Sequence, residues 1–345
     1  MTRPTFAARI VAWQRAHGRH DLPWQNTPDP YRIWLSEIML QQTQVATVIP
    51  YYTRFVAEFP DVRALAAAPL ARVLEHWSGL GYYRRAHHLH AAAKAVVADF
   101  GGAFPRTAEA MATLPGVGRS TAAAIVTLAG SARAPILDGN VKRVLARHRG
   151  IDGYPGTASV EAALWRVAEA LLPARNAGAY TQGLMDLGAT VCARKRPRCG
   201  DCPVAADCVA RSAARIEKLP SPRPRRVRPQ RAVRVLLIER AGEILLERRP
   251  AAGIWGGLWS LPELAVDDDV ARHCRSRFGA IVDAGVALPA IEHAFTHYRL
   301  TILPQRIAVR AWPLRAESPE FTWLTRADAA AAALPAPIRK LLRAL

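Results

Sequence analysis

The chain has 345 residues, half of them hydrophobic, and a formal net charge of +19. This length allows two domains or slightly more, and the hydrophobic content supports a sizeable core, which excludes a wholly disordered chain. No stretch approaches the roughly 18 consecutive apolar residues that a membrane-spanning helix needs. The excess of Lys and Arg, 47 against 28 Asp and Glu, indicates a polyanionic partner, and no basic amphipathic anchor favours a membrane surface.

The N-terminal region and the cysteines indicate where the protein works. Residues 1–5 lack the apolar core of a secretory signal peptide. Four of the five cysteines crowd between residues 192 and 208, which in such a chain is typical of metal binding rather than of disulfides. We therefore expect a cytoplasmic protein of bacterial type.

Residues 1–216 have helical patterns. Asp29-Pro30 is typical of an N-cap followed by proline at the first helical position. Apolar residues at helical spacing then predict one helix over Tyr31–Val48, which ends before Pro50. The same reasoning predicts helices over Ala86–Phe100, Gly139–His148 and Val160–Leu172.

A linker over residues 217–231 separates this region from a different pattern. Residues 220–234 hold four Pro, six Arg and no acid, a semi-rigid composition that is either solvated or in contact with phosphates. Beyond it, Ala232–Glu239 and Glu243–Glu247 predict a hairpin around Gly242. Arg299–Arg310 predicts another strand, in which Pro304 indicates an edge or a bend. With helices expected over Asp267–Phe278 and Pro335–Leu345, residues 232–345 form an α/β domain.

The crowded cysteines form a C-x6-C-x2-C-x5-C array of Cys192, Cys199, Cys202 and Cys208. Four thiolates suit either tetrahedral zinc or a [4Fe–4S] cluster, and the single C-x2-C pair favours the cluster. Between the first two cysteines lie four basic residues, which form either a pre-organised phosphate contact or a solvated charge run: Arg194, Lys195, Arg196 and Arg198. We expect Cys274, far along the chain, to be a buried small side chain.

A glycine pair lies in the run LPGVGRSTA, residues 114–122, between two helical stretches. Gly116 and Gly118 permit a tight turn with close backbone approach. The N–H groups at the start of the following helix can then hold a phosphate. In a basic chain this pattern favours a helix-hairpin-helix that grips duplex DNA through its backbone, with an ordinary helix–helix turn as the alternative.

The hairpin, Asp138 in the run LDGNVKRV and the four cysteines together resemble the endonuclease III superfamily of base-excision DNA glycosylases. Within it the chain is similar to the MutY family of adenine DNA glycosylases. Residues 36–44 have the sequence SEIMLQQTQ, and Ser120 stands where the bifunctional lyases carry lysine. A further domain with Phe295-Thr296-His297, where the family usually has Phe-Ser-His, follows the cysteines.

The resemblance covers nearly the whole chain and implies its architecture. An all-α, bilobed helix-hairpin-helix region would occupy residues 1–216 and hold one [4Fe–4S] cluster. Its first lobe would span about 22–135, and its cluster lobe 1–21 with 136–216. An α/β Nudix-like domain would occupy residues 232–345.

The resemblance also implies two catalytic carboxylates, in the manner of glycoside cleavage. Glu37 would protonate adenine at N7, which requires burial to raise its pKa to roughly 6–7; it lies in an apolar run that favours such burial. Asp138 would stay ionised and stabilise the sugar cation, electrostatically or through a transient covalent bond, and would also cap its helix. Asn140 would hold Asp138, and Ser120 takes a place where this family has Ser or Tyr.

Other residues would handle the flipped base and its partner. By resemblance, Trp24 and Gln182 line the adenine pocket, Gln42 and Tyr82 wedge into the base stack, and Thr43 and Leu80 contact the orphaned partner base; a plain core role is the alternative for Tyr82. In the second domain, Phe295, Thr296 and His297 would inspect 8-oxoguanine, with a simple strand–turn junction as the alternative.

Together these expectations describe a monofunctional glycosylase, because Ser120 cannot form the Schiff base of a lyase. It would act on A:8-oxoG and A:G mispairs in duplex DNA, as a monomer associated with the nucleoid. The alternatives are an endonuclease III-like glycosylase/lyase on oxidised pyrimidines and a non-catalytic iron–sulfur DNA-binding protein. A Nudix pyrophosphatase is excluded because the R-E-x-x-E-E core is absent, and the basic stretch 272–277 cannot gather magnesium, so none is required. The sequence identifies no protein partner.

Overall fold

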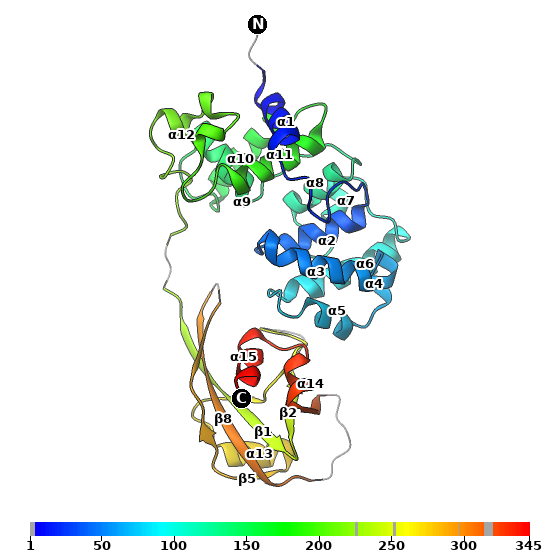
Figure 1. The fold of residues 1–345 in the computed structure, drawn as a ribbon, viewed down its shortest axis with the longest axis vertical. Helices are drawn as coiled ribbons and strands as arrows, with labels where there is room; N and C mark the ends of the chain where they lie inside the picture. Colours follow the sequence, from blue (N-terminus) through cyan, green and yellow to red (C-terminus); the bar gives the residue numbers. More distant parts are fainter. Residues whose placement is uncertain (1–3, 225–226, 251–252, 296, 314–319) are drawn as a thin grey trace. The chain divides into compact units, whose positions relative to one another are not determined.

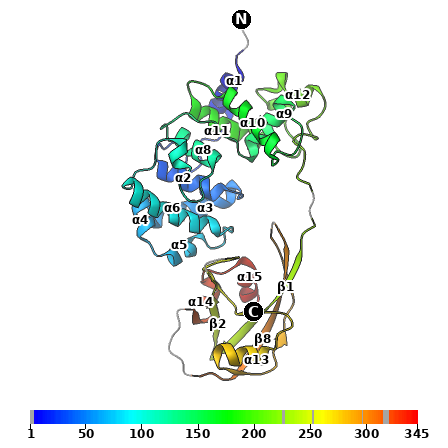
Figure 2. The same cartoon turned by 180° about the vertical axis from the view of Figure 1, so that it is seen from behind.

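The computed structural model describes residues 4–224, 227–250, 253–295, 297–313 and 320–345. Contacts divide the chain into two compact units, Met1–Ala68 with His87–Arg225, and Pro69–Ala86 with Arg226–Leu345. The first is helical and the second is built around a β-sheet (Figures 1 and 2). No helix in the described part of the chain is long and apolar enough to cross a membrane.

The first unit is a set of helices joined by short turns. Its core contains fully buried large side chains such as Trp34, Phe55 and Ile125. Its helices are α1 (Phe6–His17), α2 (Pro30–Leu40), α3 (Val45–Glu58), α4 (Val62–Ala67), α6 (Arg84–Phe100, which begins in the second unit), α7 (Ala108–Met111), α8 (Arg119–Leu128), α9 (Gly139–Arg149), α10 (Ala158–Leu171), α11 (Ala177–Thr190), the 3₁₀ turns η1 (Cys199–Asp201) and η2 (Ala205–Asp207), and α12 (Val209–Ser212).

The predicted single helix over Tyr31–Val48 is wrong, because the chain breaks between α2 and α3. The start is as expected: the Asp29 side chain accepts from the Tyr31 N–H and Pro30 opens the helix. At Gln42, however, φ is +59°, a left-handed conformation that no right-handed helix can contain. Pro50, expected to end the helix, lies inside α3. The break exposes the Gln42 side chain at a sharp turn.

The second unit carries a mixed sheet with the strand order β3-β2-β1-β8-β5. Its central strands β1 and β8 are parallel, with Gln230 opposite Arg299 and Glu239 opposite Ala308. The elements are α5 (Leu70–Trp77), β1 (Gln230–Arg240), β2 (Glu243–Arg248), β3 (Trp259–Ser260), β4 (Glu263–Leu264), α13 (Val270–Phe278), β5 (Ile281–Val282), β6 (Val286–Ala287), β7 (Ile291–Ala294), β8 (Arg299–Ala311), β9 (Phe321–Thr325), α14 (Arg326–Ala331) and α15 (Ala336–Ala344).

Side-chain alternation along β1 gives the sheet two apolar faces. Val235 and Leu237 point to one face and pack with residues of α14 and α15, including Ile338. Leu236 and Ile238 point to the other face and pack against α13, where Cys274 is fully buried as predicted. Helices therefore cover both faces of the sheet (Figures 1 and 2).

The expected hairpin around Gly242 is confirmed by the antiparallel pairing of β1 with β2. Pro304 is expected from the sequence to mark an edge strand or a bend. It does not lie on an edge strand, because β8 has neighbours on both sides. Pro304 lies opposite Val235 of β1. On its other flank it falls between the segments that pair with β6 and with β7. Its missing N–H therefore coincides with a gap in the ladder, which is why a central strand tolerates it.

Candidate active site and cysteine pocket

A cavity of about 410 Å³ lies in the helical unit, within the range of roughly 300–1,000 Å³ typical of small-molecule sites. Three of the predicted site residues line it: Trp24 from the loop before α2, Glu37 from α2 and Gln182 from α11. Trp24 is buried and its ring packs edge-on against Tyr52, 5.2 Å between centroids. The cavity thus combines an aromatic wall, an amide and a carboxyl group.

Glu37 has the protonation behaviour that an acid catalyst needs. Its neighbours on α2, Leu35, Ser36 and Ile38, are buried, and Glu37 itself is partly buried and lines the cavity. Burial, and to a lesser degree the negative charge of Asp138, raise the pKa of Glu37 to about 7. A substantial fraction of Glu37 therefore carries a proton at neutral pH.

Asp138 sits at the N-terminus of α9, close enough to Glu37 to influence its charge. Its carboxylate accepts from the Val141 N–H at 2.7 Å and from Asn140 Nδ2 at 3.5 Å. Burial outweighs these hydrogen bonds and the nearby Arg143, which lower its pKa, so the pKa of Asp138 lies above its ordinary value. Asp138 thus caps its helix, as predicted, and Asn140 contacts it. Asn140 is itself held by Arg143, whose guanidinium donates to Asn140 Oδ1 at 2.8 Å.

The side chain of Ser120 forms a hydrogen bond with the segment that precedes Asp138. Its Oγ accepts from the Leu137 N–H at 2.9 Å, so the hydroxyl fixes the backbone next to the carboxylate. Ser120 follows the glycine turn and lies in the first turn of α8. Asn140, Asp138 and Ser120 do not line the cavity wall itself, and their contacts place them beside it.

The glycine turn between α7 and α8 has the geometry of a hairpin. Gly116 has φ +78°, and a Cβ added there would lie 2.7 Å from the Cβ of His88, so no larger residue fits. Gly118 caps α8 without any side chain. The first N–H groups of α8 therefore face outward without a capping side chain, as an anion site requires.

The predicted wedge residues are distributed over the two units. Gln42 is exposed at the turn after α2, and Thr43 is half-buried beside it. Leu80 and Tyr82 belong to the second unit. Leu80 is buried, whereas Tyr82 is 47% exposed with φ +49°. An exposed aromatic side chain on a strained backbone excludes the core role considered for Tyr82 and leaves much of its ring available for contact.

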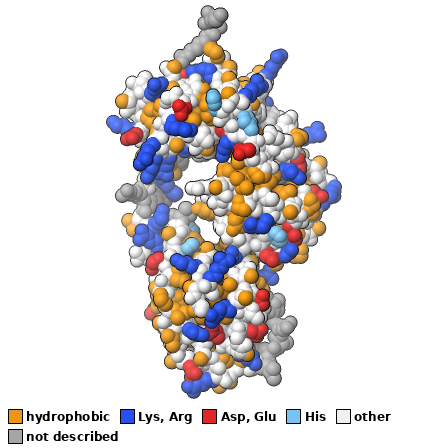
Figure 3. Space-filling model, in the orientation of Figure 1, with side chains coloured by type: hydrophobic (Ala, Val, Ile, Leu, Met, Phe, Trp, Pro, Cys, Tyr) orange, Lys and Arg blue, Asp and Glu red, His pale blue; other side chains and the backbone are white. Residues whose placement is uncertain are grey.

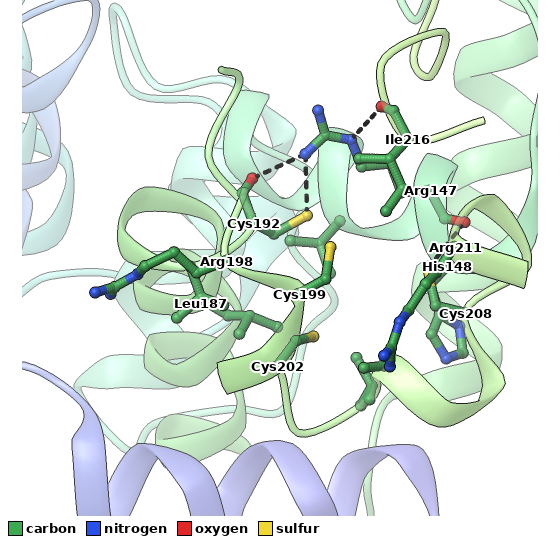
Figure 4. A pocket seen from close by; sticks show the side chains of 14 residues that line it. Arg147, His148, Leu187, Cys192, Arg198, Cys199, Cys202, Cys208, Arg211 and Ile216 are labelled. Atoms are coloured by element: carbon green, nitrogen blue, oxygen red, sulfur yellow. Dashed lines mark hydrogen bonds between the residues drawn. The ribbon is translucent and has the colours of Figure 1, made fainter. Parts of the chain in front are cut away.

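The four clustered cysteines surround one pocket (Figure 4). In the described part of the chain, no group of three or more His, Cys, Asp or Glu could hold a single metal ion. Burial, and to a lesser degree the nearby Cys192, Cys208 and Cys199, raise the pKa of Cys202 to about 11, so the sulfurs lie close together. Sulfurs spread around a pocket suit a cluster of several irons better than one tetrahedral zinc.

Arg147 of α9 is a buried residue that lines this pocket. The residue is only 4% exposed. Its Nη1 lies 3.4 Å from Cys192 Sγ and its Nε donates to the Ile216 carbonyl at 3.1 Å (Figure 4). Nη1 also donates to the Ala193 carbonyl at 2.8 Å, and Nε to the Leu219 carbonyl at 2.9 Å. One buried cation thus joins the cysteine loop to the segment that leads into the linker.

The four basic residues between Cys192 and Cys199 are exposed, as both a phosphate contact and a solvated charge run would require: Arg194, Lys195, Arg196 and Arg198. Residues 192–234 hold 13 Lys and Arg against 3 Asp and Glu, more than half of the chain's excess charge. On the face shown in Figure 3, Lys and Arg side chains gather where the chain leaves the helical unit. The excess positive charge is therefore concentrated in the cysteine loop and the residues that follow it.

In the second unit, the predicted 8-oxoguanine readers lie at the turn from β7 to β8. Phe295 belongs to an aromatic group, with ring centroids 5.3 Å from Trp255 and 4.7 Å from Tyr298. His297 is exposed, and Thr296 lies outside the described residues. The turn is therefore a strand junction, as the simpler interpretation requires, and it also presents an exposed imidazole over aromatic rings.

Two family models match the chain: "HhH-GPD superfamily base excision DNA repair protein" over residues 35–170 and "NUDIX domain" over residues 234–344. The protein "Adenine DNA glycosylase" of Buchnera aphidicola subsp. Acyrthosiphon pisum is 34% identical, covering 99% of this chain and 98% of its own. The chain belongs to the adenine DNA glycosylase family. The adenine DNA glycosylase of Mus musculus is also 34% identical, over 98% of this chain and 77% of its own length.

A solved structure supports the fold of the helical part. A thermostable thymine-DNA glycosylase is 32% identical, with a TM-score of 0.55, and covers 60% of this chain and 95% of its own. As a member of the adenine DNA glycosylase family, the chain is a DNA glycosylase of base-excision repair with a helix-hairpin-helix region and a Nudix-like domain.

The structure also contains cavity residues that sequence reasoning missed. Arg19 and His20 line the cavity with Gln14, and Arg19 forms an ion pair with Asp186 at 2.6 Å. Asp186 is fully buried on α11. Its position in the apolar run LMDLG was a usable signal, the same one that singled out Glu37.

Proposed function

We propose that this protein hydrolyses the N-glycosidic bond of adenine mispaired with 8-oxoguanine or guanine in duplex DNA, without cutting the backbone. The observation that carries the proposal is Glu37, whose pKa of about 7 and place in the wall of the cavity suit proton donation at neutral pH.

The chemistry needs a proton on the base and stabilisation of the sugar. Adenine is a poor leaving group as its anion, so Glu37 donates its proton to N7 and afterwards helps to activate water. Asp138, held by the Val141 N–H and Asn140, stabilises the cationic sugar from its fixed position. Ser120 supports this arrangement through the Leu137 N–H.

Duplex DNA must deliver the adenine to this cavity by base flipping. The uncapped start of α8 and the exposed basic loop of residues 194–198 bind phosphates. Gln42 and Tyr82 wedge into the stack, since both are exposed on positive-φ backbone. Thr43 and Leu80 contact the partner base.

We further propose that Cys192, Cys199, Cys202 and Cys208 hold one [4Fe–4S] cluster. The fit rests on four sulfurs around one pocket, on the nearby Arg147, Arg198 and Arg211 side chains, and on the N–H group of Arg147 directed at Cys192 Sγ. When bound, the cluster supplies iron–sulfur bonds that pin the basic loop. Arg147 positions Cys192 and the loop carbonyls for that purpose.

The second domain would then inspect the base opposite adenine through Phe295, Thr296 and His297, without magnesium. Its stretch 272–277 lies in α13, where Arg277 pairs with Glu247 at 2.7 Å, so this helix offers cations where a Nudix hydrolase offers carboxylates. Activity in the presence of a chelator of divalent cations, equal to that with added magnesium, is the expected result.

Strand cleavage separates this proposal from a glycosylase/lyase. A lyase needs a free amine nucleophile, and Lys142, the lysine nearest to Asp138 in sequence, is in an ion pair with Glu161 at 2.6 Å. Duplex with A opposite 8-oxoguanine, incubated with the enzyme and analysed with and without alkali, should break only after alkali. Rapid nicking in step with base release, before alkali, would contradict the monofunctional assignment.

A further inference from the structure

A fully buried carboxylate, Asp186, lies one helical turn after Gln182 on α11. Its Oδ1 accepts from Arg19 Nε at 2.7 Å and from Gln182 Nε2 at 3.0 Å. Its Oδ2 accepts from the Arg19 backbone N–H at 3.0 Å. Arg19 thus holds both oxygens from the loop after α1, so the carboxylate has a fixed orientation toward Gln182.

This contact decides which end of the Gln182 amide faces the cavity. A carboxylate only accepts hydrogen bonds, whereas a glutamine amide carries a donor and an acceptor end. Asp186 therefore takes the NH₂ end of Gln182. Since Gln182 lines the cavity, its carbonyl oxygen, Oε1, is the end left for a bound base.

An acceptor at this position distinguishes purines by their group at C6. Adenine carries an amine there, which donates a hydrogen bond, while hypoxanthine carries a carbonyl, which cannot. Polar groups that are left unpaired in a closed site cost far more than a lost contact in water. A glutamine whose amide can rotate would bind both bases. A glutamine whose acceptor end is fixed toward the cavity prefers the base that carries the amine.

We propose that Asp186 is a positioning residue that keeps Gln182 a hydrogen-bond acceptor and so sets a preference for 6-amino over 6-oxo purines. This inference rests on the proposed function, since it assumes that the cavity takes a purine. It assigns a role to the Asp186–Arg19 pair beyond holding the loop after α1.

Four variants separate this role from a structural one, the fourth being the combination D186N/Q182M. In D186N, the oxygen stays at the place of Oδ2, because the Arg19 backbone N–H there is a fixed donor, and the introduced NH₂ takes the place of Oδ1. That NH₂ cannot accept from Gln182, so Gln182 reverses and offers NH₂ to the cavity, and the Arg19 side chain loses its bond to Oδ1. In D186N/Q182E, the same introduced NH₂ group meets a carboxylate, which again leaves an acceptor for the base, and the pair keeps its total charge. Q182M removes the glutamine amide while it leaves the Asp186–Arg19 contact intact.

The measurement is the single-turnover rate of base release from duplexes with adenine or hypoxanthine opposite 8-oxoguanine. We expect the adenine-to-hypoxanthine ratio to fall about tenfold in D186N, the equivalent of one hydrogen bond. It should fall as far in Q182M and no further in D186N/Q182M. D186N/Q182E should return to within about threefold of the wild-type ratio.

Equal slowing of both bases in D186N, with an unchanged ratio, would overturn the inference and leave a purely structural Asp186. Where D186N is too unstable to assay, the D186N/Q182E ratio carries the test, and a value like that of Q182M contradicts the inference. Wild-type protein that releases no adenine would overturn the proposed function, and this inference with it.

Discussion

The two predicted recognition regions of the molecule differ in how their polar groups are held. Around the helical cavity, Glu37 and Asp138 are partly buried and Asp186 is fully buried, and both aspartates are fixed by hydrogen bonds from neighbouring side chains or backbone. At the turn of the second domain, His297 is exposed and its neighbour Phe295 makes ring contacts. Proton transfer requires perturbed, fixed groups, whereas inspection of a base can rely on exposed side chains. Substitutions should therefore reduce the activity much more at the cavity than at the turn.

The largest effect is expected at Glu37. Glu37→Gln keeps the shape of the side chain but removes its acid, so the single-turnover rate of adenine release should fall by about 10²–10⁴-fold. DNA affinity should stay within a few-fold of wild type. Glu58→Gln, on exposed α3 surface, is the matched control and should leave the rate unchanged. Parallel loss of binding and rate in Glu37→Gln would count against a catalytic role.

A substitution of Arg147 tests whether the cysteine pocket depends on this buried cation. Arg147→Met leaves the carbonyls of Ala193, Ile216 and Leu219 without their donor. Unfolding free energy should fall by about 3 kcal/mol, and iron should be lost to a chelator faster, as followed by the visible absorption of the cluster. Arg166→Met, at an exposed position of α10, should change neither. Equal iron loss in both variants would refute the role of Arg147.

The raised pKa of Glu37 also predicts a dependence of stability on pH. The folded state holds the proton up to about pH 7, while the unfolded chain releases it near the ordinary value of about 4.3. Wild type therefore loses stability as pH rises between these values, by about 3–4 kcal/mol in all. Glu37→Gln lacks this loss. Its unfolding free energy relative to that of wild type, measured by denaturant titration, should therefore rise from pH 5 to 8. A constant difference between the two proteins would mean that Glu37 has an ordinary pKa.

The smallest effect is expected in the second domain. His297→Ala should lower the preference for adenine opposite 8-oxoguanine over adenine opposite guanine by about fivefold, as for one exposed hydrogen bond. Thr296→Ala should act in the same direction. Competition between the two duplexes in one reaction gives the ratio directly. Equal loss on both duplexes would indicate a packing role, and a loss as large as that of Glu37→Gln would break the contrast between the two regions.

Features with local causes could be predicted from the sequence. The caps at Asp29 and Asp138, the hairpin around Gly242 and the grouping of four cysteines each depend on residues close together in the chain. The apolar neighbours of Glu37 indicated its burial, while its place at the active site was implied by the family resemblance. These are the positions where local spacing and the folded structure agree.

Features imposed by distant contacts could not be predicted. The left-handed turn at Gln42 divides a continuous helical pattern, and nothing in the run SEIMLQQTQ signals it. Pro304 is tolerated in a central strand because two separate segments flank it. Asp186 meets Arg19 across 167 positions, so the buried pair that orients Gln182 is visible only in the folded chain.

The most direct test of the account measures single-turnover base release on three duplexes, with A opposite 8-oxoguanine, A opposite guanine, and an oxidised pyrimidine opposite guanine. Release of adenine from the first two, fastest opposite 8-oxoguanine and with strand breaks only after alkali, is the predicted result. Release of the pyrimidine with immediate strand breaks, and no release of adenine, would contradict the assignment of Glu37 and its cavity to adenine.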